Sequence, residues 1–183
     1  WELITLRNQW TAYIDVLLNA HSVNGNGEDD INQNMTLPYA DVYPYRTCDI
    51  ILPTDTSGYV YFLVSVRDFD RDYIGQTKNL AQRFNQHNSG QGAEGTADPY
   101  YRPYCVAAYI CGLSHMEKVG RETLERKWKL FNKEAIRNGR RTIEHRILQG
   151  ERVVQEYNAD CLEEERIQLV VTIKRKMADM QEH

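Results

Sequence analysis

One stretch of the sequence, residues 58–87, narrows the possible folds more than any other. It reads GYVYFLVSVRDFDRDYIGQTKNLAQRFNQH. Residues 59–64 are aromatic, aliphatic or β-branched, which is the composition of a buried strand, and Tyr73-Ile74-Gly75 predicts a second, shorter strand. The polar residues 67–72 between them predict a hairpin loop. The stretch therefore predicts two adjacent strands, each of which carries tyrosine.

A helix is predicted directly after the second strand. Thr77 or Asn79 can cap its N-terminus. The residues expected to face inward are Leu80, Ala81 and Phe84. Arg83 and His87 are four residues apart, so they share the flank of the helix next to this apolar stripe. Two phenols, a guanidinium and an imidazole are thereby gathered on one short unit.

The order of these motifs resembles that of the GIY-YIG nucleases. In that family a first strand ends in tyrosine, a second carries Tyr-Ile-Gly or Tyr-Val-Gly, and an arginine and a histidine follow on the next helix. Here Tyr59-Val60-Tyr61 replaces Gly-Ile-Tyr but keeps the final tyrosine, and Tyr73-Ile74-Gly75 is intact. The resemblance extends over residues 58–132 and implies that Tyr61, Tyr73, Arg83 and His87 are catalytic.

The resemblance also implies a metal-binding glutamate on a helix after the third strand. Residues 106–110 form an apolar run suited to that strand, and Ser114-His115-Met116-Glu117 predicts a capping box that opens the helix. Glu125 is the predicted ligand, because Leu124-Glu125 followed by Trp128 resembles the structure-specific branch of the family. Alternative ligands on the same segment are Glu117 and Glu122. The positions expected to pack inward are Met116, Val119, Leu124 and Trp128.

The chemistry of phosphodiester hydrolysis explains this set of residues. It needs an activated water, neutralisation of charge on the nonbridging oxygens and help for the departing oxygen. One hard divalent ion, Mg²⁺ or Mn²⁺, suits a single carboxylate such as Glu125. The planar fork of Arg83 suits the scissile phosphate.

The choice of base stays open. A tyrosine with a pKa of about 10 needs a nearby cation or a proton relay to act as a base, and the sequence leaves open whether Tyr61 or Tyr73 does so. It also leaves open whether His87 is a base or a phosphate ligand.

The distribution of charge is more informative about a nucleic-acid partner than the net charge of −4. Acidic residues gather at 28–30 and 163–165, whereas basic residues follow Glu125 and either track phosphates or form a solvated helix face. The Gly-rich segment 88–103 is long enough to be a functional loop near DNA. The resemblance implies double-stranded or branched DNA as the substrate. The predicted nucleic-acid contacts are Lys78, Arg102, Arg121 and Asn132, with Asn138 as an alternative for the asparagine of the family.

The whole chain is predicted to be an α/β protein of the α+β kind. We expect an N-terminal helix and linker over 1–57, a nuclease core over 58–135 and a C-terminal helical extension over 136–183 packed on the core. The core should hold a small three-stranded mixed or antiparallel sheet flanked by helices. The N-terminal apolar stripe is Leu3, Leu6, Trp10, Tyr13, Ile14 and Leu17, and the C-terminal one is Leu162, Leu169, Val170, Ile173, Met177 and Met180.

The remaining sequence features concern the cellular location of the protein and its parent chain. No run approaches 18 apolar residues, so no membrane span is expected. Four cysteines without CxxC spacing predict reduced thiols and an intracellular location, cytoplasmic or nuclear. Because the chain begins at Trp1, we expect it to belong to a longer parent chain with other domains. The sequence thus predicts a metal-dependent DNA endonuclease, with a catalytically inactive nucleic-acid-binding or assembly module as the alternative.

Overall fold

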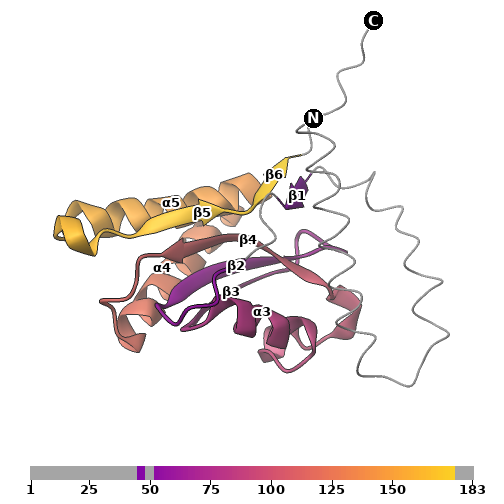
Figure 1. Ribbon diagram of the computed structural model, residues 1–183. Helices are drawn as coiled ribbons and strands as arrows, with labels where there is room; N and C mark the ends of the chain where they lie inside the picture. The colour runs from indigo at the N-terminus through magenta and orange to yellow at the C-terminus, as the bar shows by residue number, and fades with distance from the viewer. Residues whose placement is uncertain (1–44, 48–51, 176–183) are drawn as a thin grey trace, which may run out of the picture. The chain divides into compact units, whose positions relative to one another are not determined.

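A computed structural model of the 183-residue chain describes residues 45–47 and 52–175 (Figure 1). The chain divides into two compact units, residues 51–172 and a unit formed by both ends of the chain. Of the latter, the structure describes β1 (Tyr45–Thr47) and β6 (Ile173–Arg175), which pair antiparallel. The predicted N-terminal stripe, together with Met177 and Met180, lies outside the described residues.

An antiparallel sheet of four strands in the order β3-β2-β4-β5 forms the centre of the 51–172 unit. Its strands are β2 (Tyr59–Ser65), β3 (Asp72–Thr77), β4 (Tyr104–Cys111) and β5 (Gln168–Val171). Every residue of β2 is buried, as expected for a strand paired on both edges and covered on both faces. The predicted α+β class and the hairpin of the first two strands are confirmed, but the sheet has one more strand than predicted.

Three helices flank this sheet: α3 (Leu80–Asn88), α4 (Lys118–Arg137) and α5 (Ile143–Ala159). Asn79 caps α3 by accepting a hydrogen bond from the Gln82 amide at 3.0 Å, which confirms one of the two predicted caps. The predicted capping box at Ser114 is wrong, because α4 begins after Glu117 without a side-chain cap. Val119, predicted to pack inward, is 66% exposed, whereas Leu124 and Trp128 are buried.

Alternation along β2 sends neighbouring side chains to opposite faces of the sheet. Phe62 packs against Trp128 of α4, with ring centroids 5.7 Å apart. Tyr61 points to the other face and contacts His87 of α3. The strand thus separates an apolar layer under α4 from a polar cluster beside α3.

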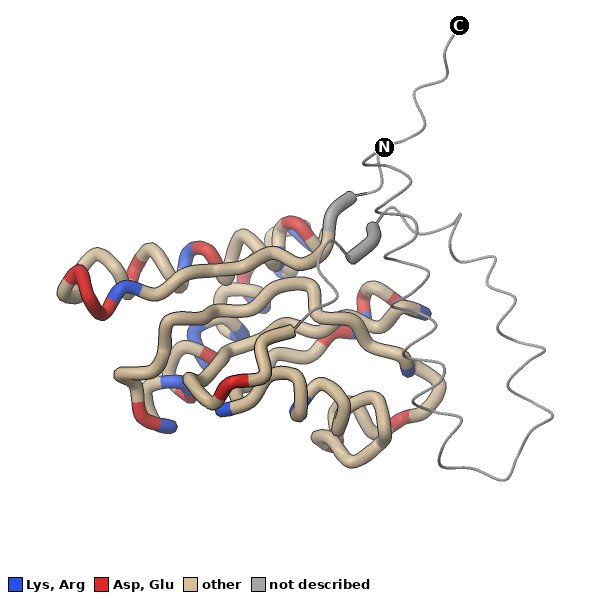
Figure 2. Tube along the Cα trace, viewed as in Figure 1, with Lys and Arg blue, Asp and Glu red and all other residues tan. Residues whose placement is uncertain are grey.

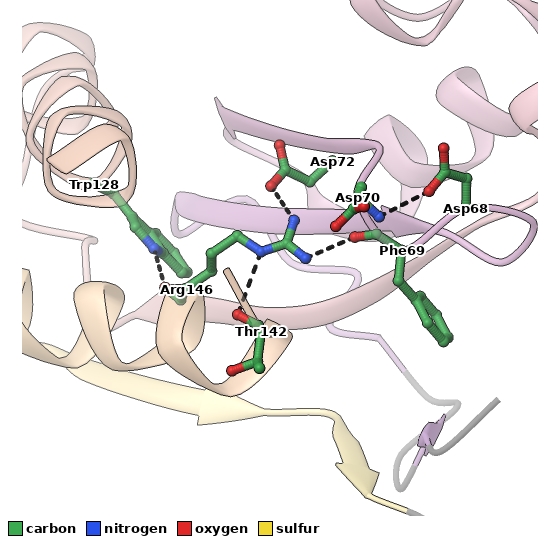
Figure 3. Close-up of polar contacts among 7 residues, drawn as sticks. All are labelled: Asp68, Phe69, Asp70, Asp72, Trp128, Thr142 and Arg146. Carbon is green, nitrogen blue, oxygen red and sulfur yellow. Dashed lines mark hydrogen bonds and ion pairs between the residues drawn. The ribbon is translucent and has the colours of Figure 1, made fainter. Parts of the chain in front are cut away.

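Arg146 of α5 ties that helix to the β2–β3 hairpin (Figure 3). Its guanidinium forms an ion pair with Asp72 and donates to the Phe69 carbonyl at 2.7 Å. The carbonyl of Arg146 accepts a hydrogen bond from the Trp128 indole at 2.9 Å. One buried residue of α5 therefore holds both the hairpin and α4.

The C-terminal segment departs from the predicted continuous helix. Helix α5 ends at Ala159, and Asn158 bonds both the N–H and the carbonyl of Ile167 at 2.9 Å, which turns the chain back toward the sheet. Leu169 and Val170 then pair with Ile110 and Tyr109 of β4. Leu169 and Val170 of the predicted stripe therefore lie in an edge strand, because β4 offers an open row of backbone donors and acceptors.

Two further findings concern the described residues alone. None of their helices is long and apolar enough to cross a membrane. Cys105, Cys111 and Cys161 are free thiols, and Cys48 lies outside the described part of the chain.

Candidate active site

Three predicted catalytic side chains meet on the α3 face of the sheet. The Tyr61 hydroxyl lies 2.7 Å from His87 Nε2. The Tyr73 ring lies against both, with centroids 6.2 Å from Tyr61 and 4.9 Å from His87. Tyr61 is 1% exposed and His87 is fully buried, so their hydrogen bond is shielded from bulk water.

Gly75 makes room for this cluster. It lies opposite Tyr61 in the β2–β3 ladder. A Cβ at this position would come within 2.6 Å of the Tyr61 hydroxyl oxygen and 2.7 Å of the Tyr73 ring. The glycine of Tyr73-Ile74-Gly75 is therefore needed for space rather than for a special backbone angle.

Thr96, which the sequence analysis did not select, completes the buried polar cluster. It ends a 3₁₀ turn, Glu94–Thr96, in the Gly-rich segment after α3. Its hydroxyl oxygen lies 2.6 Å from His87 Nδ1 and 3.0 Å from the Ala93 carbonyl, and the residue is 1% exposed. A threonine in a loop carries no local signal of this contact, because the fold alone brings it to His87.

Burial sets the protonation states of the central pair. It raises the pKa of the Tyr61 phenol well above its usual range, an effect that the nearby Arg83 guanidinium opposes. Burial, reinforced by the positive charge of Arg83, lowers the pKa of His87 to about 4. At neutral pH the cluster therefore holds a neutral phenol and a neutral imidazole.

Arg83 and Glu125 border the buried pair from two helices. Each acts electrostatically on Tyr61, the guanidinium lowering the phenol pKa and the carboxylate raising it. Glu125 is paired with Lys129 at 2.5 Å, and the Lys129 ammonium lies 5.9 Å from the centre of the Tyr73 ring. The alternative ligand Glu122 pairs instead with Lys118, at 3.6 Å. The structure thus brings all five predicted catalytic residues into one neighbourhood.

Comparison with protein families agrees with this geometry. The model of the GIY-YIG catalytic domain matches residues 57–139. This segment belongs to the GIY-YIG family. No curated protein matches the chain. Membership implies nuclease activity in general, which fits a site made of phenols, an imidazole, a guanidinium and a carboxylate.

The GIY-YIG site has donors suited to a hard divalent ion. Glu125 supplies one carboxylate beside the tyrosines, and the described residues include no group of three or more His, Cys, Asp or Glu side chains that could hold a metal ion. Asn132 lies on the same helix, and its buried side-chain oxygen has no hydrogen-bond partner within the described ranges. A single carboxylate leaves most positions around an ion to water, as Mg²⁺ prefers.

A basic groove opens beside the GIY-YIG site, between β3 and α4. Its volume is about 610 Å³. Its lining residues are Asp72, Tyr73, Ile74, Lys129, Asn132, Lys133, Ile136 and Arg137. Figure 2 shows that basic and acidic positions are interspersed along the trace of this unit. The positive side chains of the groove therefore form a local feature rather than one pole of the molecule.

The four residues predicted to contact nucleic acid lie in different environments. Lys78 is exposed, and Asn132 lines the groove. Arg102 donates to the Ala97 carbonyl at 3.2 Å. Arg121 is buried, and it bonds the Gln76 side chain at 3.0 Å and the Met116 carbonyl at 3.2 Å. In this arrangement Arg121 is committed to protein partners, whereas Lys78 and Asn132 face space that a ligand can enter.

Proposed function

We propose that this chain is a metal-dependent DNA endonuclease that hydrolyses phosphodiester bonds at the Tyr61–His87 cluster. The observation that supports the proposal most directly is the 2.7 Å hydrogen bond between the Tyr61 hydroxyl and His87 Nε2. The buried imidazole is neutral at physiological pH, so Nε2 has a lone pair for the Tyr61 proton. The low pKa of His87 makes it a weak base, and the negative charge of a bound phosphate would raise that pKa. Tyr61 is therefore the tyrosine that we assign to the proton transfer, and His87 is its acceptor.

The proton path follows from this arrangement. A water beside Tyr61 gives a proton to the phenol oxygen while Tyr61 passes its own proton to His87 Nε2. The resulting hydroxide attacks phosphorus, the bond from phosphorus to the 3′ oxygen breaks, and solvent protonates the departing oxygen. His87 then returns its proton to solvent, which restores the neutral pair. Tyr61 remains a neutral phenol throughout, so its raised pKa does not obstruct the reaction.

Charge on the phosphate is met from two sides. Arg83 lies beside the Tyr61–His87 pair, and one of its nitrogens donates to Gln86 at 2.9 Å while the other donors of its fork can reach a phosphate. Glu125 would hold Mg²⁺ or Mn²⁺. When bound, such an ion supplies Lewis-acid polarisation of the phosphate and lowers the pKa of nearby water.

The groove beside Tyr73 supports DNA as the polymer. Lys133 and Arg137 lie one turn apart on α4, and neither forms an ion pair within the described part of the chain. Two unpaired cations in a groove that Tyr73 also lines suit a phosphate backbone. We propose that double-stranded or branched DNA follows this groove.

Plasmid nicking with and without Mg²⁺ or Mn²⁺ tests the proposal on wild type, Glu125→Gln and Glu122→Gln. Glu125→Gln preserves the shape of the side chain but removes its charge, so cleavage should be abolished while DNA binding persists. Glu122→Gln is the matched control, and its cleavage should be close to wild type. If wild type binds DNA but never nicks it under any metal condition, the chain is an inactive binding module instead. Loss of cleavage in Glu122→Gln alone would move the ligand by one helical turn.

A further inference from the structure

We infer that Thr96 is a positioning residue that holds His87 in the tautomer with its proton on Nδ1, so that Nε2 is free to accept the proton of Tyr61. Neither the family match nor the proposed function assigns a role to this threonine. The expected effect of Thr96 on DNA cleavage rests on the proposed function. Its expected effect on the His87 tautomer is independent of that function.

The hydrogen-bond chain allows one consistent set of donors. Among the described residues, the hydrogen-bond partner of the Tyr61 hydroxyl is His87 Nε2, at 2.7 Å, and the nearby Arg83 guanidinium also acts on the phenol. A guanidinium only donates, so His87 Nε2 is the acceptor for the Tyr61 proton among the described residues. A neutral imidazole that accepts at Nε2 carries its proton on Nδ1.

The opposite end of the chain agrees with this assignment. The Nδ1–H group donates to the Thr96 oxygen at 2.6 Å, and the single hydroxyl proton of Thr96 goes to the Ala93 carbonyl at 3.0 Å. In the reverse arrangement Thr96 would donate to Nδ1 and the imidazole would donate to Tyr61. The buried Tyr61 hydroxyl would then lack an acceptor in the described part of the structure, at a cost of about 1–3 kcal/mol.

The segment that carries Thr96 is fixed against the imidazole. The Asn88 side chain bonds the backbone N–H and carbonyl of Tyr104, at 2.7 and 3.0 Å, and so joins the two ends of the segment. Gly92 passes so close to His87 that a Cβ would lie 2.6 Å from Nδ1. The Thr96 amide also donates to the Ala93 carbonyl, at 2.9 Å. Thr96 is therefore held in place by its own loop, as a residue that orients another must be.

Nitrogen-15 NMR of the imidazole tests the inference without DNA or metal. Long-range ¹⁵N–¹H spectra distinguish a protonated from an unprotonated ring nitrogen, and His87→Gln identifies the His87 signals. Wild type should show a protonated Nδ1 and a bare Nε2. Thr96→Val removes the acceptor at nearly constant volume, so it should shift His87 toward the Nε2–H form. Thr96→Ser keeps the hydroxyl and should restore the wild-type pattern.

A matched control separates the tautomer from general destabilisation. Thr172 is also buried, at 1% exposure, and its hydroxyl donates to the Val106 carbonyl away from His87. Thr172→Val should lower stability to a similar extent and leave the His87 signals unchanged. A bare Nδ1 in wild type, or the same tautomer in Thr96→Val as in wild type, would overturn the inference.

The kinetic arm concerns nicking by the same variants. Partners that orient a metal-bound imidazole contribute about 10–100-fold to activity. We expect an effect of the same order here, so Thr96→Val should nick DNA slower by about that factor and Thr96→Ser should recover most of the rate. If wild type shows the Nδ1–H tautomer but no variant cleaves DNA, the proposed function fails and the positioning of His87 stands. If Thr96→Val changes the tautomer but cleaves at the wild-type rate, the positioning is real but has no role in catalysis.

Discussion

At the residue scale, the site combines neutral groups in its interior with charged groups at its border. Tyr61 and His87 are buried and uncharged, whereas Arg83 and Glu125 carry charge nearby. This division fits the task that the proposed function gives to each group. A proton can move between neutral partners without creating a buried charge pair in advance, while the charged groups are available to phosphate and metal.

Replacement of Arg83 by lysine tests whether the guanidinium fork matters. Lysine keeps one positive charge but loses the second parallel donor, which is needed most as charge develops on the phosphate. Single-turnover cleavage should slow by about 100-fold, and DNA affinity should fall by less than about tenfold. Arg152→Lys on the exposed side of α5 is the control and should cleave normally. Near-normal cleavage by Arg83→Lys would show that Arg83 is an ordinary surface residue.

The lowered pKa of His87 predicts a pH dependence of stability. The unfolded imidazole binds a proton below about 6.5, but the folded one does so only below about 4. Between these values the unfolded state binds more protons, so the free energy of unfolding should fall as the pH drops from 6.5 to 4. A difference of about 2.5 pKa units corresponds to about 3 kcal/mol. Urea unfolding across this range should show the slope in wild type, and His87→Gln should flatten it. Equal slopes in both proteins would contradict the assignment.

At the element scale, a buried cation on α5 fastens the hairpin that carries Tyr73. The Arg146 side chain is 3% exposed, whereas the side chain of its partner Asp72 is 29% exposed. Arg146 also donates to the carbonyls of Phe69 and Thr142 (Figure 3). Helix α5 lies outside the segment matched by the family, yet it supports the β2–β3 hairpin on which the site is built.

The two halves of this ion pair should differ in their contribution to stability. Asp72→Ala leaves a buried guanidinium without its counter-charge and should cost about 3–5 kcal/mol of unfolding free energy. Arg146→Met fills a similar volume and leaves a carboxylate that reaches water, so its cost should be smaller. Chemical denaturation measures both. Lys118→Met, which breaks an exposed pair with Glu122, is the control and should cost about 1 kcal/mol or less. A larger loss in Arg146→Met than in Asp72→Ala would refute this account.

At the scale of the whole molecule, the net charge of −4 hides a local basic groove. Lys133 and Arg137 face the groove, whereas Arg126 and Lys127 are exposed on α4 but do not line it. Helix α4 therefore carries two pairs of basic residues with the same charge, one pair lining the groove and the other outside it. Only the first pair lies beside Tyr73.

This difference gives a direct test of where DNA lies. Binding should be measured by fluorescence anisotropy over a range of salt, in a Glu125→Gln background that does not cleave. Lys133→Gln with Arg137→Gln should reduce the slope of log K against log salt by about 2, because each phosphate contact contributes about 0.9. Arg126→Gln with Lys127→Gln removes the same charge and should leave the slope nearly unchanged. Equal effects of the two pairs would indicate a nonspecific charge effect rather than a DNA path along the groove.

Local pattern was sufficient for the hairpin and for a helix cap at Thr77 or Asn79, whereas Tyr61, Tyr73, Arg83 and His87 were selected because their joint order resembles that of the family. These features depend on residues close in the chain, where strand composition and helical spacing act directly. The C-terminal strand β5 was missed for the opposite reason. Leu169 and Val170 fit an apolar helical stripe as well as a strand, and only the open edge of β4 decides between them.

The sequence by itself, through its resemblance to the family, indicated Tyr61, Tyr73, Arg83 and His87, whose order along the hairpin and α3 is local. The tertiary structure alone decided how those groups are protonated and held. Burial makes Tyr61 and His87 neutral, and the fold brings Thr96 to the imidazole from a loop with no distinguishing pattern. Arg146 of α5 reaches Asp72 of the hairpin across a sequence separation of 74 residues. Desolvation and contacts over such separations arise only when the chain is packed, so no local reading of the sequence contains them.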